Sequence, residues 1–165
     1  MNVLLVYPQS PVTFWSFTYA LRFVRKKAAL PPLGLLTIAA MLPTDWAKRL
    51  IDMNVRDLCD SDLAWADYVW ISAMAIHRKS ALEVISRCKK AGVKVVAGGP
   101  LFTCEPDQFE GVDHMVLNEA EITLPPLLED MAAGCAKPVY ATEGFADLAA
   151  TPVPDWSLCE MEKYA

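Results

Sequence analysis

The sequence predicts a doubly wound α/β domain, in which a parallel five-stranded sheet is flanked by helices. Two observations lead to this prediction. Continuous apolar runs such as VLLVYP, from Val3 to Pro8, are typical of strands that are covered on both faces. Helical segments alternate with these runs along the chain, which indicates parallel pairing through right-handed crossovers. At 165 residues the chain has the length of one domain.

The expected strands recur along the chain and are separated by helical or turn segments. After the first strand they are KRLIDMN, YVWISAM, VKVVAGG and HMVLN, which cover residues 48–54, 68–74, 93–99 and 114–118. The segment KPVYAT, residues 137–142, is a candidate for a short edge strand.

Proline and glycine mark the ends of the helices between these strands. The segment PLGLLTIAAMLP begins at Pro32 and has Pro43 beyond its end, and both prolines are helix-boundary signals. KSALEVISRCKKAG ends at Gly92 and EAEITLPPLLEDMAAG ends at Gly134, as expected of glycine at a helix C-terminus. SDLAWAD predicts a short helical turn.

The segment that follows the first strand, residues 9–31, is long and rich in aromatic residues. Loops of more than about 12–15 residues are usually functional or disordered, and aromatic residues argue against disorder. Two interpretations stay open. FTYALRFVRK is a helical excursion that packs its aromatic side chains on the domain's own core, or it presents them to a ligand or another domain.

Composition excludes several classes of protein. A net charge of −5 argues against general nucleic-acid binding, although RFVRKK, residues 22–27, is a local basic patch. No apolar run approaches the roughly 20 residues that cross a bilayer, so no transmembrane segment is expected. The start of the chain lacks the basic region of a signal peptide. We therefore expect a soluble, cytoplasmic protein.

Ligands of doubly wound sheets bind beyond the carboxyl ends of the strands. The sequence has neither GxGxxG after the first strand nor a P-loop motif, which argues against dinucleotide and nucleoside triphosphate sites. One strand ends instead in two adjacent glycines, Gly98 and Gly99. One interpretation is a tight turn, although a tight turn normally needs only one glycine. The second interpretation is that a bulky ligand lies against the backbone there.

The ends of the third and fourth strands, ISAM and AGGP, resemble the Ser-x-Leu and Gly-Gly elements of cobalamin-binding domains. Ser72 precedes Gly98 by 26 positions, close to that family's spacing. The resemblance implies a flavodoxin-like fold of the cobalamin-binding type, with the cofactor's nucleotide tail inserted beside the sheet. Gly99→Leu is then expected to fill the tail channel and weaken binding while leaving the fold largely intact.

Nearly the whole chain is similar to the amino-terminal domain of cobalamin-dependent radical S-adenosylmethionine enzymes, including the hopanoid C-2 methylase group. The resemblance implies a cobalamin-binding domain at residues 1–146. Residues 147–165 would be a linker toward a radical S-adenosylmethionine barrel that is absent from this chain. The longer protein would use methylcobalamin as methyl donor to a carbon-centred substrate radical.

The iron–sulfur motif of that barrel, CxxxCxxC, is missing from this chain. S-adenosylmethionine and a 4Fe-4S cluster are therefore expected in the longer protein only. The chain alone is expected to catalyse nothing. A module of a different class, a flavodoxin-like binding or protein-interaction module without corrinoid, stays open as the alternative.

The expected lower ligand of cobalt is a separate question. Methyl-transferring cobalamin domains carry DxHxxG after the first strand, and its histidine binds cobalt. This chain has PQSPVTFW there, without histidine, so base-off binding with no histidine from this loop is expected. His77 is a weak candidate for cobalt, against the alternatives of a solvated loop histidine or a residue at a helix N-terminus. No other metal site is expected.

The candidate cofactor-binding residues all follow the carboxyl ends of expected strands. The loop from Ser10 to Trp15 is expected to line the lower face of the corrin. Glu119 and Glu121 either accept hydrogen bonds from the cofactor or only favour the start of the next helix. The complete set is Pro8, Gln9, Ser10, Phe14, Trp15, Ser72, Ala73, Met74, Ile76, His77, Gly98, Gly99, Pro100, Thr103, Asn118, Glu119 and Glu121.

Overall fold

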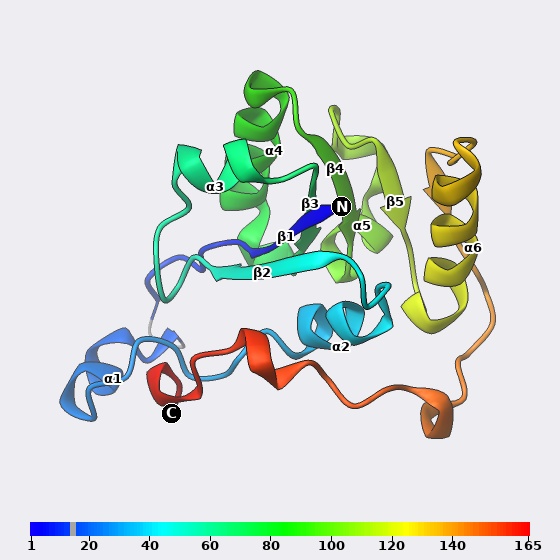
Figure 1. Ribbon diagram of the computed structural model, residues 1–165. Coiled ribbons are helices and arrows are strands. Elements are labelled where there is room, and N and C mark those ends of the chain that lie inside the picture. Colours follow the sequence, from blue (N-terminus) through cyan, green and yellow to red (C-terminus); the bar gives the residue numbers. More distant parts are fainter. Residues whose placement is uncertain (14–15) are drawn as a thin grey trace.

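Within residues 1–13 and 16–165, which the computed structural model describes, six parallel strands form one sheet in the order β2-β1-β3-β4-β5-β6 (Figure 1). Its first five strands have the order of a flavodoxin-like doubly wound sheet, so the predicted fold class is confirmed. The sixth strand is the short edge strand for which KPVYAT is the candidate. The strands are β1 (Asn2–Tyr7), β2 (Ala47–Asp52), β3 (Tyr68–Ser72), β4 (Lys94–Gly98), β5 (His114–Val116) and β6 (Val139–Tyr140).

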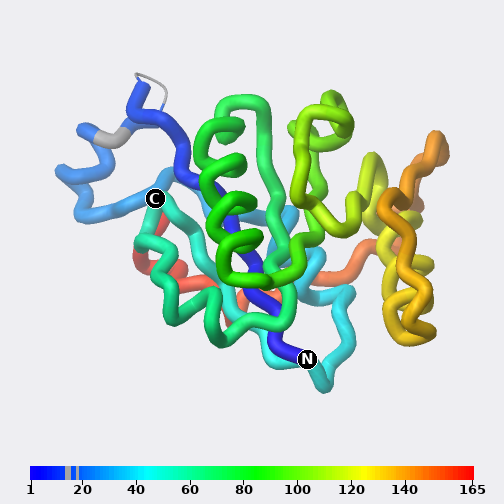
Figure 2. The backbone as a smooth tube through the Cα atoms, turned by 90° about the horizontal axis from the view of Figure 1, so that it is seen from above, coloured from blue at the N-terminus to red at the C-terminus, as the bar shows by residue number. Residues whose placement is uncertain are grey.

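Helices cover both faces of the sheet (Figures 1 and 2). One face packs against α3 (Asp60–Trp65), α4 (Arg78–Ala91) and α5 (Pro100–Cys104). The other face packs against α2 (Leu33–Met41) and α6 (Ala120–Ala133). None of the helices in the described part of the chain is both long and apolar enough to cross a bilayer.

The apolar run of the first strand results from burial on both faces. Side chains alternate between the faces of a strand. Leu4 and Val6 belong to the core beneath α3 and α4, whereas Val3 and Leu5 belong to the core beneath α2 and α6. All four side chains are completely buried.

Helix α5 is the element that the sequence does not predict. It lasts only five residues after the two glycines, too few for a periodic pattern. Pro100 occupies its first position, where the fixed φ of proline suits a helix and its missing N–H is not needed. Leu101 and Phe102 are buried, and packing therefore stabilises this short helix.

The segment after β6 returns across the domain beside α2. The N–H of Asp155 donates to the carbonyl of Leu36 in α2 at 2.9 Å. Ala28 and Tyr164 form a parallel bridge, and the C-terminus lies near the α1 end of the molecule in both views (Figures 1 and 2). The buried hydroxyl of Tyr164 donates to Asp52 Oδ2 at 3.1 Å. The expected linker thus packs on the domain.

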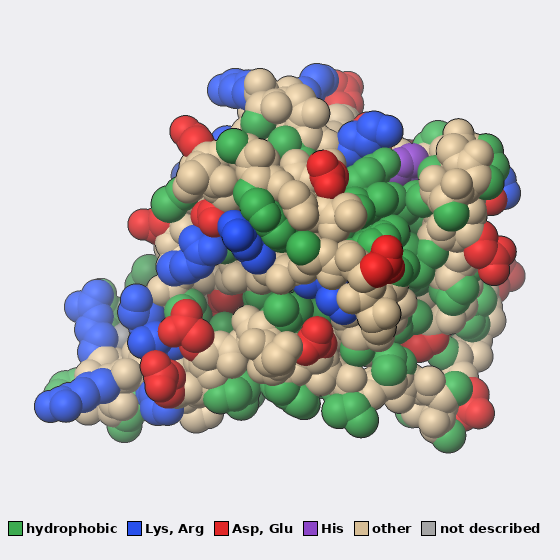
Figure 3. Space-filling view, viewed as in Figure 1, with side chains coloured by type: hydrophobic (Ala, Val, Ile, Leu, Met, Phe, Trp, Pro, Cys, Tyr) green, Lys and Arg blue, Asp and Glu red, His purple; other side chains and the backbone are tan. Residues whose placement is uncertain are grey.

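The long loop after β1 contains the short helix α1 (Thr18–Phe23). Leu21 is buried there, whereas Phe17, Tyr19 and Phe23 are exposed. The interpretation that these aromatic side chains pack on the domain's own core is therefore wrong for these three residues. Figure 3 shows Lys and Arg side chains gathered at the same end of the molecule. An exposed surface that is both aromatic and basic results.

Candidate functional site

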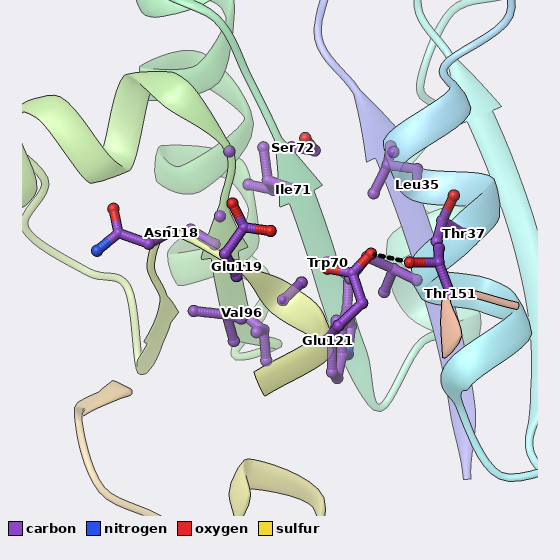
Figure 4. A pocket seen from close by; sticks show the side chains of 17 residues that line it. Leu35, Thr37, Trp70, Ile71, Ser72, Val96, Asn118, Glu119, Glu121 and Thr151 are labelled. Atoms are coloured by element: carbon purple, nitrogen blue, oxygen red, sulfur yellow. Dashed lines mark hydrogen bonds between the residues drawn. The ribbon is translucent and has the colours of Figure 1, made fainter. Parts of the chain in front are cut away.

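A cavity of about 260 Å³ lies at the carboxyl ends of β3, β4 and β5, between α2 and α6 (Figure 4). The three strands form its floor and the two helices its walls. A threonine from the returning C-terminal segment completes the lining. The lining residues are Gly34, Leu35, Thr37, Ile38, Trp70, Ile71, Ser72, Val96, Ala97, Gly98, Gly99, Val116, Asn118, Glu119, Ala120, Glu121 and Thr151.

Strand register explains why residues far apart in sequence meet in this cavity. Ser72 pairs directly with Gly98, and Gly98 pairs with Val116. Trp70 and Val96 form the pair two residues earlier, on the same face of the sheet. The spacing between Ser72 and Gly98 therefore corresponds to lateral neighbours at one height of the sheet. Trp70, Val96 and Val116 make the floor apolar.

The two adjacent glycines are each required by the backbone. Gly99 has φ 86° and ψ 176°, a conformation that is nearly exclusive to glycine. A Cβ on Gly99 would lie 2.8 Å from Ser72 Oγ and 3.2 Å from the Ala73 carbonyl oxygen. A Cβ on Gly98 would lie 2.7 Å from the Val116 carbonyl oxygen. The expectation that Gly99→Leu leaves the fold largely intact is therefore wrong.

Polar groups surround the mouth of the cavity. Thr151 Oγ1 donates to Glu121 Oε1 at 3.0 Å, the contact drawn in Figure 4. Glu119 precedes α6 and makes no side-chain cap, so its carboxylate does not close the helix N-terminus. Asn118 has φ 63°, and its N–H donates to Thr103 Oγ1 at 3.1 Å. The mouth thus offers two carboxylates beside an apolar floor.

Trp70 contributes an unusual group to the floor. Its side chain is only 3% exposed. Among the described residues, its Nε1 is the only fully buried side-chain nitrogen or oxygen that has no hydrogen-bond partner. A buried donor without an acceptor reduces stability by about 1–3 kcal/mol, so the cavity floor contains an unmet hydrogen bond.

His77 lies next to the cavity, in a separate cluster at the end of β1. The ring is completely buried, with its centroid 4.7 Å from that of Tyr7. The Met74 N–H donates to Nδ1 at 3.2 Å, so Nε2 carries the proton of the neutral ring and donates to Ser10 Oγ at 2.9 Å. Burial lowers the pKa of His77, which favours that neutral ring. Neither nitrogen is free to bind cobalt in this arrangement.

If His77 does not bind cobalt, the sequence leaves two alternatives, a solvated loop histidine and a residue at a helix N-terminus, and the structure distinguishes them. The solvated loop histidine is wrong because the side chain is buried. The helix N-terminal position is confirmed, since His77 directly precedes α4. Its partner Ser10 is fixed by its own N–H, which donates to Asn54 Oδ1 at 2.8 Å. The N–H of Gln9 donates to Ser80 Oγ at 2.9 Å, so both residues after Pro8 are held in place.

The predicted site residues therefore divide into groups. Six line the cavity, namely Ser72, Gly98, Gly99, Asn118, Glu119 and Glu121. Met74, Ile76 and Pro100 are exposed at the same edge of the sheet, and Ala73 is buried beneath them. The cavity lining also does not include Thr103, or His77 and its neighbours Pro8, Gln9 and Ser10. Phe14 and Trp15 lie outside the described residues.

Sequence reasoning missed several lining residues. Trp70 could have been found, because it stands two positions before Ser72 and so faces the same side of the strand. Gly34 and Thr37 are on a helix that is apolar on nearly every side, so no stripe identifies the face that meets the cavity. Thr151 reaches the cavity only through the folding back of its segment.

Comparison with known proteins adds an independent finding. The sequence pattern described as "B12 binding domain" matches residues 23–128 of this chain. An uncharacterized methyltransferase of Synechocystis is 39% identical over 99% of the chain and 31% of its own length. The hopanoid C-2 methylase of Rhodopseudomonas palustris is 32% identical over 99% of the chain and 32% of its own length.

A third relative matches a shorter part of the chain. It is the bacteriochlorophyllide d C-8(2)-methyltransferase of Chlorobaculum tepidum, which is 28% identical over 76% of this chain and 27% of its own length. The chain thus spans about a third of the length of the curated relatives that it matches.

Proposed function

The chain belongs to the B12-binding domain family, and from this premise we propose that it holds methylcobalamin in the base-off form for a longer methyltransferase. The observation that carries the proposal is the cavity between α2 and α6, which lies within the part of the sheet where ligands of this fold bind. All six of the cavity-lining residues that the resemblance implies, from Ser72 to Glu121, fall inside the matched region.

The cavity has the shape and chemistry for the cofactor's nucleotide tail. A floor of Trp70, Val96 and Val116 offers apolar contact to a flat heteroaromatic base. Ser72 lies between that floor and the mouth, and Glu119 and Glu121 are at the mouth, where a ribose would place its hydroxyl groups. Gly98 and Gly99 line the cavity beside Ser72 with backbone atoms alone.

The corrin would lie across the edge of the sheet outside this cavity. Met74 and Ile76 are 46% and 49% exposed there, although both are apolar. They would contact the macrocycle, together with Pro100 and the loop that begins at Pro8. The proposal also includes the prediction from sequence that Phe14 and Trp15 line the lower face of the corrin.

The bound corrinoid would supply a transferable methyl group on cobalt. The part of the chain described here supports the expectation that no histidine binds the metal from below. His77, which follows β3, has both ring nitrogens engaged, and the loop after β1 contains no histidine. Its role in the proposal is to hold Ser10, and through it the start of that loop, against the domain.

We further propose that a radical S-adenosylmethionine barrel accompanies this domain in the longer protein. Residues 1–146 would form the cofactor domain and residues 147–165 the linker. S-adenosylmethionine and a 4Fe-4S cluster would be bound by the barrel, and methyl transfer to a substrate radical would occur between the two parts. The exposed surface of α1 is the region that we place against that barrel. Five unpaired cysteines suit a reducing, cytoplasmic setting.

We expect the purified chain to retain hydroxocobalamin through desalting at micromolar protein concentration. Absorbance of the protein fraction in the visible range measures the retained corrinoid. The alternative, a flavodoxin-like interaction module without corrinoid, predicts a colourless fraction. A colourless fraction, both from the chain and from a version extended to the full length of its relatives, would contradict the proposal.

A further inference from the structure

We propose that the indole N–H of Trp70 donates a hydrogen bond to a ring nitrogen of the corrinoid's lower base, and so selects bases that carry a free acceptor nitrogen. This inference rests on the proposed function, because it assigns a role to one residue of that cavity. It makes Trp70 a specificity-determining residue for the cofactor.

The first step is the unmet hydrogen bond. Trp70 Nε1 is buried and has no acceptor among the described residues. Buried polar groups in folded proteins nearly always have hydrogen-bond partners. An exception indicates a partner that is present only when a ligand is bound. The indole ring lines the cavity, so an occupant that packs against the Nε1 edge of the ring would provide the acceptor.

No acceptor among the described residues is within hydrogen-bonding distance of Trp70 Nε1. The residue pairs with Leu5 and Val96 in mid-sheet, where the main-chain groups of the strands bond one another. Its side chain belongs to an otherwise almost wholly apolar cluster beneath α2 and α6. Glu121 Oε1 accepts the hydrogen bond of Thr151 at the mouth, and Trp70 Nε1 reaches neither oxygen of this carboxylate. The position of the indole thus leaves the ligand as the source of the acceptor.

The second step is the chemistry of the base. A benzimidazole that has left cobalt exposes a ring nitrogen with an in-plane lone pair, which is a good acceptor for an N–H donor. The same nitrogen is occupied when it binds cobalt. The hydrogen bond is therefore available only to the base-off form, and it shifts the cofactor toward that form by differential affinity.

Replacing Trp70 with phenylalanine tests the contact, because an aromatic ring remains and the donor is lost. We expect Trp70→Phe to bind hydroxocobalamin roughly tenfold more weakly than the unchanged chain, as for loss of one buried hydrogen bond. Cobinamide has no nucleotide base, so both proteins should bind it equally. A cobamide with a phenol as its lower base, which has no ring nitrogen, should also be bound equally by both.

Two controls separate this role from a structural one. Trp46→Phe removes an indole that packs on the same core but does not line the cavity, and it should leave cobalamin affinity unchanged. The smaller phenylalanine ring is expected to lower the melting temperature of the ligand-free protein somewhat, because Trp70 is buried in the core. Equal binding of cobinamide by both proteins is therefore the control that the cavity itself is intact.

Three outcomes would overturn the inference. Equal cobalamin affinity of the Trp70→Phe and unchanged chains would show that the donor makes no contact with the base. Equal losses for cobalamin and cobinamide would show that the indole acts only in the fold. If the unchanged chain binds neither corrinoid, the proposed function itself fails, and this inference fails with it.

Discussion

Gly34→Phe is expected to fill the cavity that would hold the nucleotide base, while the domain remains folded. Gly34 lies on the face of α2 that carries Thr37 and Ile38, and all three residues line the cavity. A Cβ on Gly34 meets no atom within 4 Å, so a larger side chain can enter the cavity without strain. Loss of the buried base contact, about 3 kcal/mol, predicts a roughly hundredfold weaker affinity for hydroxocobalamin in a titration.

Gly34→Ala is the matched control for this change. Alanine favours the helix and is too small to fill the cavity, so its cobalamin affinity should equal that of the unchanged chain. Thr37→Phe blocks the same wall from one turn further along α2 and should repeat the loss. Undiminished cobalamin affinity in both phenylalanine variants, with a native circular dichroism spectrum, would place the base elsewhere.

Gly99→Ala is expected to lower the free energy of unfolding by about 2–4 kcal/mol, measured by urea denaturation without ligand. Two effects combine. The glycine-only backbone conformation costs alanine about 1–3 kcal/mol, and the new Cβ must displace Ser72 Oγ and the Ala73 backbone.

Gly134 provides the control for this second prediction. It also has a positive φ, 72°, but a Cβ there meets no atom within 4 Å. Gly134→Ala should therefore cost only the backbone term, about 1–2 kcal/mol. Equal costs at the two positions would show that the crowding beside Ser72 does not constrain the chain.

Much of the fold could be predicted because its strands are buried on both faces. Such strands appear in the sequence as apolar runs, and Gly92 and Gly134 end the helices α4 and α6 where they are expected to. Helix α5 could not be predicted, since five residues that begin with a proline carry no periodic signal. The edge strand β6 has only two residues, and its pairing with β5 depends on tertiary contact.

The candidate site could be predicted only along the strands. Ser72 and Gly98 were identifiable because parallel strands bring their carboxyl ends to one edge. The burial of His77 could not be read from its neighbours in sequence, since it depends on Tyr7 and on Ser10 from a distant loop. The wall formed by α2 was equally hidden, because sequence does not show which side of an apolar helix meets a cavity.

The central claim is that the chain binds a corrinoid with its lower base removed from cobalt and inserted between α2 and α6. Free methylcobalamin at neutral pH has its base on cobalt, and its visible spectrum differs from that of the base-off form. Titration of methylcobalamin with the unchanged chain at neutral pH tests the claim most directly. We predict conversion to the base-off spectrum, complete at equimolar protein; a bound corrinoid that keeps the base-on spectrum would contradict the account.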